Sequence, residues 1–244
     1  LPAFGPHKAK AIQRADVRRL LATIVDRGAP IQANRTLALL RKVFNWGMAE
    51  DLVDRNPCDR LPAPARENRR DRVLGEDEIG ALVRALTGPA PDGEAGLAMT
   101  DAIKLILRLQ LLTAQRCGEV LRARWDEIDL AAGWWTIPSA KSKNKLAHRV
   151  PLSSQALAVL AEAKARNPDR AHVFPSPHGD KPMVITAVGL AVRRNLDRLP
   201  GVGHFRPHDL RRTAASHMTG AGVSRLTVGK ILNHAEPGVT AVYD

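Results

Sequence analysis

Cysteines and long apolar runs are scarce in this chain of 244 residues. The two cysteines, Cys58 and Cys117, form no CxxC pair, which excludes that type of redox or metal motif, and we expect both to be reduced thiols. No apolar run of about eighteen residues occurs, which excludes a membrane-spanning helix. The opening residues, LPAFGPHKAK, lack the apolar core of a signal peptide. These absences predict a protein of the cytoplasm.

Acidic residues are too few to balance the basic ones. The chain has 37 Lys and Arg against 25 Asp and Glu, which gives a net charge of +12. This excess predicts a polyanionic partner, nucleic acid first and an anionic membrane surface second. Residues 1–72 carry 15 Lys and Arg against 8 Asp and Glu, so the shorter first part of the chain is the more basic.

The first part of the chain is predicted to be helical. Asp16 is suited to cap a helix that Gly28 would stop. A second helix is predicted over residues 33–48, where Leu37, Leu40, Phe44 and Met48 are spaced three and four apart. Basic residues on such helices are usually solvated, but the overall charge favours DNA contact. The residues assigned to DNA contact here and below are Arg35, Arg41, Lys42, Arg69, Arg70, Lys141 and Lys145.

A linker is predicted over residues 61–72, LPAPARENRRDR, which hold two prolines, four arginines and no apolar periodicity. It would separate a helical DNA-binding domain, residues 1–60, from a catalytic domain, residues 73–244. A charged linker can also follow a phosphate backbone, so we expect the two domains to clamp a duplex.

The second part is predicted to be mostly helical with a small β-hairpin. Helices are expected over 76–86, 95–112, 117–123, 153–166 and 185–199. Two short strands, 134–138 and 148–152, flank a loop that holds Lys141, Lys143 and Lys145. One loop ammonium could protonate a leaving oxygen; the alternative, a basic loop that touches phosphates only electrostatically, is preferred for two of the three lysines.

Arg116 stands where one of these helices is predicted to begin. Backbone N–H groups at such a position can face an anion. Glu119 follows one turn later, so an ordinary intrahelical ion pair is the alternative.

Ionisable residues gather near the C-terminal end of the sequence. A helix that begins at Pro207 would place His208 and Arg211 on one face. An apolar-periodic run over 223–232 would put His234 just beyond a helix end.

The only tyrosine, Tyr243, follows this cluster. A phenol has a pKa of about 10 and attacks only where a base or a positive field assists it. Arginine matches a pair of phosphate oxygens, and histidine exchanges a proton near neutrality. Together these groups predict phosphoryl transfer to tyrosine. A metal site at His204 and His208 is not expected, because no nearby carboxylate or cysteine completes a ligand set.

Four motifs carry a resemblance to a known family. In chain order they are TAQRCGEV, KNKLAHRVPLS, PHDLRRTAASHM and LNHAEPGVTAVYD. Their order and spacing resemble the tyrosine recombinases, specifically phage-type and prophage-type integrases. The earlier stretch ANRTLALLRKVFNWGMAEDLVDRNPC resembles the core-binding domain of those integrases, so the resemblance covers nearly the whole chain.

The resemblance implies site-specific DNA recombination through a 3′-phosphotyrosine, without metal, ATP or other cofactor. It implies a helical core-binding domain followed by a mixed, mostly helical catalytic domain. Arg116 and Arg211 would hold the scissile phosphate, and Tyr243 would attack it. His208 would accept the tyrosine proton, and His234 would hydrogen-bond the phosphate. Lys143 would act as the general acid, and Glu119 would support the first arginine. Lys143 is chosen over Lys141 because its distance to the VPLS strand suits the family pattern better.

The implied partners are double-stranded DNA with an attachment-site core, a homotetramer on synapsed DNA and accessory DNA-bending proteins, in a bacterial cytoplasm. Ala114 and Asn233 depart from the pattern, since the family commonly has glycine at both positions. The abrupt start and the end at Asp244 lead us to expect a fragment of a longer protein. A type IB topoisomerase and a non-catalytic DNA-binding module with the same fold remain alternatives.

Overall fold

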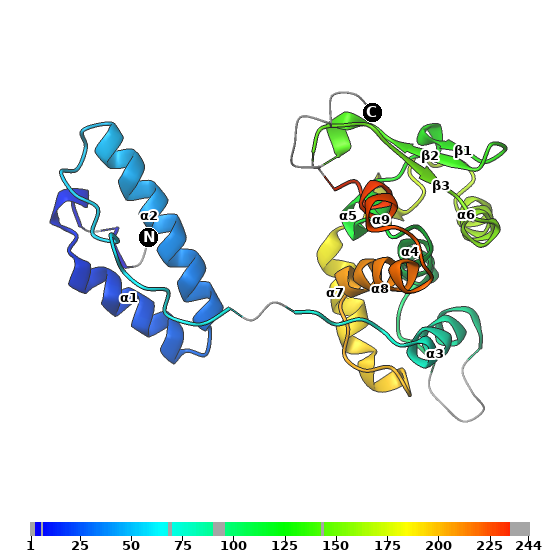
Figure 1. The fold of residues 1–244 in the computed structure, drawn as a ribbon, viewed down its shortest axis with the longest axis horizontal. Helices are drawn as coiled ribbons and strands as arrows, with labels where there is room; N and C mark the ends of the chain where they lie inside the picture. The colour runs from blue at the N-terminus through cyan, green and yellow to red at the C-terminus, as the bar shows by residue number, and fades with distance from the viewer. Residues whose placement is uncertain (1–2, 6, 68–69, 90–95, 143, 235–244) are drawn as a thin grey trace. The chain divides into compact units, whose positions relative to one another are not determined.

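Figure 1 shows the computed structural model, which describes residues 3–5, 7–67, 70–89, 96–142 and 144–234. It divides into two compact units, Leu1–Arg70 and Asp71–Asp244, and each has its own hydrophobic core. Within the described ranges, no helix has the length and apolar character needed to cross a bilayer.

Two helices, α1 (Arg14–Asp26) and α2 (Pro30–Ala49), pack against each other in the first unit, beside the short helix η1 (Ala9–Ala11). Gly28 adopts a φ of 82° just after α1, so the predicted stop is confirmed. The prediction that Asp16 is the N-cap is wrong, because α1 begins two residues earlier. Asp16 lies in the first turn and its carboxylate accepts a hydrogen bond from the Gln13 N–H at 2.9 Å.

The buried face of α2 differs from the predicted stripe at its C-terminal end. Leu37 and Phe44 are buried as expected, but Met48 is 42% exposed. Gly47 is buried instead, because a side chain of the following loop packs against it: a Cβ added there would lie 3.2 Å from Val53 Cγ2. The helix also starts earlier than predicted, with Pro30 in its first turn, where a missing N–H leaves no bond unmade.

Part of the predicted linker belongs to the first unit. Leu61 is buried in its core. The Asn34 amide donates to the Ala65 carbonyl at 2.7 Å and accepts from the Ala65 N–H at 3.0 Å. Residues 61–65 are therefore held on the first unit. Arg72, at the other end of the linker, forms an ion pair with Glu78 of the second unit.

Helix α4 (Asp101–Thr113) is the centre of the second unit. It packs against α3 (Glu76–Thr87), α5 (Cys117–Leu121), α6 (Ser154–Arg166) and α8 (Pro207–Gly220). Seven of its thirteen residues are buried, so the helix is enclosed on most sides. Two further helices, α7 (Ile185–Arg194) and α9 (Arg225–Ile231), both contribute to the surroundings of the site described below.

The predicted hairpin is present as β2 (Trp134–Ile137) and β3 (His148–Pro151), antiparallel with Ile137 opposite His148. A short strand, β1 (Ile128–Asp129), extends this sheet on the other side of β2. A second hairpin, β4 (Pro175–Ser176) with β5 (Gly179–Pro182), was not predicted. Its strands are too short to show an alternating pattern.

Several predicted helix boundaries in the second unit are also wrong, and two of them have a clear tertiary cause. The helix predicted over 95–112 begins at Asp101. The helix predicted over 185–199 ends at Arg194, because the buried Asn195 side chain donates to the Ala191 carbonyl at 2.8 Å and accepts from the Ala98 N–H at 2.5 Å. The helix predicted over 117–123 ends at Leu121, because residues 123–125 instead pair with residues 171–173: the Val173 N–H donates to the Ala123 carbonyl at 3.0 Å, and the Trp125 N–H donates to the Ala171 carbonyl at 3.1 Å.

Candidate active site

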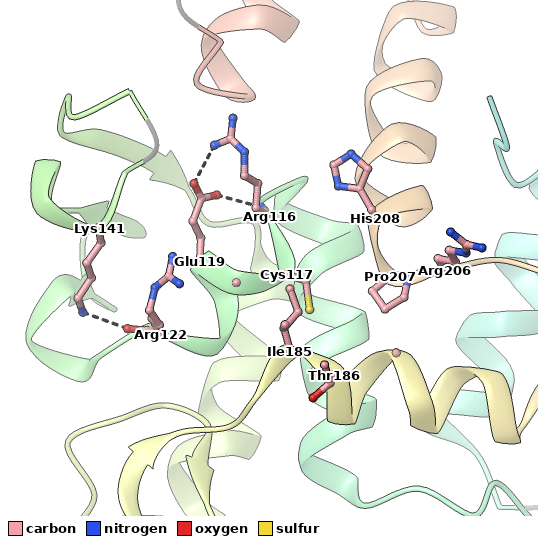
Figure 2. Close-up of a pocket in the computed structure, with 12 residues that line it drawn as sticks. Arg116, Cys117, Glu119, Arg122, Lys141, Ile185, Thr186, Arg206, Pro207 and His208 are labelled. Carbon is pink, nitrogen blue, oxygen red and sulfur yellow. Dashed lines mark hydrogen bonds and ion pairs between the residues drawn. The ribbon is translucent and has the colours of Figure 1, made fainter. Parts of the chain in front are cut away.

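Arg116 is held in place by a buried carboxylate. It precedes α5, as predicted, and Glu119 in the first turn is only 5% exposed. The Glu119 carboxylate accepts from the Arg116 N–H at 2.9 Å and from its Nη1 at 2.8 Å, and Figure 2 shows both bonds. One carboxylate therefore fixes both the backbone and the guanidinium of Arg116. The two residues line a cavity together with His208, which points from the first turn of α8.

Arg211 is buried deeper on α8, at 4% exposure. Its Nη1 donates to the Ala114 carbonyl at 2.8 Å, and its Nη2 donates to the Leu232 carbonyl. Two carboxylates on α5 and α8 form ion pairs with other arginines, Glu119 with Arg116 and Asp209 with Arg212.

The guanidinium of Arg211 is thus oriented by two carbonyls, and the Glu119 carboxylate offsets only part of its charge repulsion. Burial, and then the charge of Arg116, lower the pKa of Arg211 to about 10. An anion bound between the two guanidinium groups would relieve both effects.

Ala114 links the positions of Arg211 and Arg116. It ends α4 in the left-handed conformation, with φ at 56°, although this conformation costs roughly 1–2 kcal/mol for a residue with a side chain. Its carbonyl accepts from Arg211, and Arg116 follows only two residues later in the chain. The sharp turn therefore places the two arginines together.

Two histidines lie near the arginines and have lowered pKa values. Partial loss of hydration lowers the pKa of His208, and the charges of Arg212 and Arg211 lower it further, although the residue is exposed at the surface. Partial loss of hydration, and then the charges of Arg211 and Arg116, lower the pKa of His234. The lowered pKa favours the neutral form of both imidazoles near pH 7, the form that can accept a proton.

The position of His234 follows from the end of α9. Asn233 has a φ of 50°, and the His234 N–H donates back to the Gly229 carbonyl at 3.0 Å. This left-handed turn closes the helix, as predicted, and leaves His234 exposed just beyond it.

His148 is a site residue that the sequence analysis did not single out. It is 8% exposed, and its Nε2 lies 3.1 Å from the Ile231 carbonyl. Because a carbonyl only accepts, Nε2 carries the hydrogen. Gln115 Nε2 donates to the same carbonyl at 3.0 Å, so two separate segments anchor the last turn of α9. The alternation of buried and exposed residues along β3 indicates that the side chain at position 148 points inward. Its hydrogen-bond partner lies 83 residues away, so the local sequence gives no sign of this contact.

The lysines of the hairpin loop differ in their surroundings. Lys141 donates to the Arg122 carbonyl at 3.0 Å and forms an ion pair with Glu127, so its ammonium is already held by the protein. Lys145 is exposed, with φ at 59°. Lys143 and Tyr243, the predicted acid and nucleophile, lie outside the described residues. The structure thus places four of the six predicted catalytic residues, Arg116, His208, Arg211 and His234.

The residues assigned to DNA contact in the first unit are not equivalent. Arg35 and Lys42 are exposed on α2. Arg41 donates from Nη2 to the Leu61 carbonyl at 2.8 Å, which ties α2 to the segment that follows the helices. Arg70 is half-buried, and Arg69 lies outside the described residues. The part of the chain described here contains no cluster of three or more His, Cys, Asp or Glu that could hold a metal ion.

Known proteins resemble the chain in sequence and in fold. The model of the phage integrase family matches residues 72–244, and that of the phage integrase central domain matches residues 1–63. Tyrosine recombinase XerC from Xylella fastidiosa (strain M23) is 28% identical over 236 residues, which are 96% of this chain and 76% of that protein. Prophage integrase IntZ from Escherichia coli (strain K12) is 31% identical over 205 residues, 83% of this chain and 48% of IntZ.

Lambda integrase has a similar fold in two assemblies. A dimer bound to a COC′ core site matches with a TM-score of 0.73 at 19% identity, over 96% of this chain and 83% of that one. A tetramer bound to a Holliday junction matches with a TM-score of 0.68 at 20% identity, over 93% of this chain and 65% of that one.

Proposed function

The chain belongs to the phage integrase family and is a tyrosine recombinase, and we propose that Tyr243 attacks a DNA phosphodiester held between Arg116 and Arg211. The reaction is site-specific DNA recombination, in which strands are cut and rejoined. The proposal assigns the individual steps of this reaction to the residues of the site.

The observation that carries the assignment is the buried guanidinium of Arg211 beside that of Arg116. In phosphoryl transfer, negative charge is spread over the non-bridging oxygens of the transition state. Donors that are already oriented stabilise this charge without reorganising during the reaction. Arg211 uses two of its N–H groups on the carbonyls of Ala114 and Leu232. Its fork is thereby fixed, and the remaining N–H groups are available for a phosphate.

The proposed cleavage step is balanced in atoms and protons. The Tyr243 oxygen forms a bond to phosphorus, and neutral His208 accepts the phenol proton. The bond from phosphorus to the 5′ oxygen breaks, and Lys143 supplies the proton that makes a 5′ hydroxyl. His234 donates a hydrogen bond to the phosphate. The product is a 3′-phosphotyrosine, which a 5′ hydroxyl can attack in the reverse sense, so the proposed cycle consumes no ATP and needs no metal.

The proposed substrate is double-stranded DNA that carries an attachment-site core. The net charge of +12 and the exposed Arg35 and Lys42 of α2 support contact of the first unit with the duplex. We extend the proposal to a clamp formed by both units, and to a homotetramer on synapsed DNA assisted by DNA-bending proteins in the bacterial cytoplasm. The tetramer of lambda integrase on a Holliday junction supports the assembly.

Covalent trapping tests the proposal. The protein is incubated with a DNA duplex that is nicked near the crossover point of a candidate attachment core, so that a short fragment diffuses away after cleavage. A denaturing gel should show protein shifted by covalent DNA, and Tyr243→Phe should show none while it still binds the duplex. Binding without any covalent product on cleavable cores would instead support a non-catalytic DNA-binding module. Relaxation of a supercoiled plasmid by monomers without paired sites would support a topoisomerase.

A further inference from the structure

Three side chains form a closed ring of hydrogen bonds between the β2–β3 loop and the end of α9. Asn144 Nδ2 donates to Asn233 Oδ1 at 2.6 Å, and Asn233 Nδ2 donates to Ser142 Oγ at 2.8 Å. Ser142 Oγ in turn donates to Asn144 Oδ1 at 2.6 Å. We call these three residues the asparagine ring. Two of them flank Lys143 in sequence, and the third directly precedes His234.

The chemistry of the ring explains why an amide stands at position 233. Each member donates once and accepts once within the ring, and hydrogen bonds arranged head to tail polarise one another. The backbone at Asn233 is left-handed, a conformation that glycine adopts at lower cost. The backbone therefore does not require this side chain. Its amide, with a donor and an acceptor on one group, is what closes the ring.

The end of α9 is also where the phosphate site is anchored. Arg211 donates to the Leu232 carbonyl, and His148 and Gln115 hold the Ile231 carbonyl. Asn233 follows these two carbonyls in sequence. The loop on both sides of Lys143 and the guanidinium of Arg211 thus share one attachment point.

We propose that Asn233 is a positioning residue that fixes the β2–β3 loop relative to the phosphate site, so that protonation of the leaving oxygen depends on the asparagine ring. This inference rests on the proposed function, in which Lys143 is the general acid. Loss of the ring would leave phosphate binding by Arg116 and Arg211 unchanged. It would slow only the step that needs a proton on the 5′ oxygen.

The test compares two DNA substrates under single-turnover conditions. One has the ordinary 5′ oxygen, and the other has sulfur at that bridging position, a better leaving group that needs no general acid. Asn233→Gly keeps the backbone conformation and removes the amide. It should cleave the oxygen substrate about tenfold more slowly, a part of the 10²–10⁴ that a general acid contributes, and the sulfur substrate at nearly the wild-type rate. Ala147→Gly, which loosens the same loop outside the ring, should cleave both substrates normally.

A second variant tests the ring from its other side. Asn144→Ala should show the same selective defect, and the double variant should be no slower than either single variant, because both remove one ring. Defects that multiply would show independent roles and overturn the inference.

Lys143→Ala separates failure of the inference from failure of the proposed general acid. If sulfur rescues Lys143→Ala but Asn233→Gly is equally slow on both substrates, or slow on neither, the inference alone is overturned. If Lys143→Ala is impaired equally on both substrates, Lys143 is not the acid, and the inference fails with that role.

Discussion

Replacement of Arg211 by lysine keeps the positive charge and removes the fork. In the folded protein Nη1 and Nη2 reach two carbonyls on different segments, those of Ala114 and Leu232. A single ammonium on a shorter side chain cannot donate to both and also face a phosphate. Hydrogen bonds to charged groups contribute ~1.5–3 kcal/mol each, so losing one should lower the free energy of unfolding by about 2 kcal/mol.

The effect on cleavage should exceed the effect on stability. Loss of one oriented donor to a developing oxyanion costs roughly 10²–10³ in rate, so cleavage of the nicked substrate by Arg211→Lys should fall by ~10²-fold or more. The binding of intact duplex, measured by fluorescence anisotropy, should remain nearly unchanged because the net charge is the same. Urea unfolding, measured on the same preparation, reports the stability loss separately.

Arg212→Lys is the matched control. Arg212 neighbours Arg211 on α8, but its side chain is 33% exposed and pairs with Asp209. The Asp209 carboxylate is buried. Lysine keeps a cation beside this carboxylate and retains the charge near His208, so cleavage should stay near the wild-type rate. Near-normal cleavage by Arg211→Lys would remove Arg211 from the reaction. An equal loss in both variants would show that the effect is a general disturbance of α8.

Three further predictions concern stability, pH dependence and DNA binding. The pair of Glu78 with Arg72, and then the hydrogen bonds from the N–H groups of Gly75 and Gly203, lower the pKa of Glu78 from 4.5 to about 2. Because the pKa of Glu78 is lower in the folded state than in the unfolded state, the carboxylate should stabilise the fold by ~1–2 kcal/mol above pH 4.5, and this stabilisation should be lost as the pH falls toward 2. Thermal melts of the wild type and of Glu78→Gln should therefore differ at pH 7 and converge in acid. Since the pKa of His208 is lowered from 6.5, cleavage by the free enzyme should decline only below pH 6.5. Arg212→Gln removes one cause of the lowered pKa and should move this decline to higher pH. A pH profile that does not move would argue against His208 as the proton acceptor. Lys42→Ala should weaken DNA binding and make the slope of log K against log salt concentration shallower by about one, which binding titrations at several salt concentrations can show. Arg41→Ala should mainly lower the free energy of unfolding, which urea unfolding can show.

Features that depend on neighbours in sequence could be predicted from the sequence alone. The starts of α3 at Glu76 and of α8 at Pro207, and the left-handed stop at Gly28, are confirmed. So is the hairpin of β2 and β3. Capping, turn formation and side-chain periodicity act over a few residues, so their signals are present in the local sequence. The ion pair of Arg116 with Glu119 is of this kind, because three residues on a helix bring side chains together.

Features that depend on distant partners were decided only by the tertiary structure. Asn195 ends α7 through a contact with Ala98, 97 residues earlier. Asn233 reaches Asn144 across 89 residues, and Arg211 owes its burial and orientation to Ala114 and Leu232. The sequence by itself therefore determined the family, the local elements and the types of reacting group. Only packing decided which carbonyls orient the arginine and which loop is tied to α9, because such hydrogen bonds form between segments with no local pattern in common.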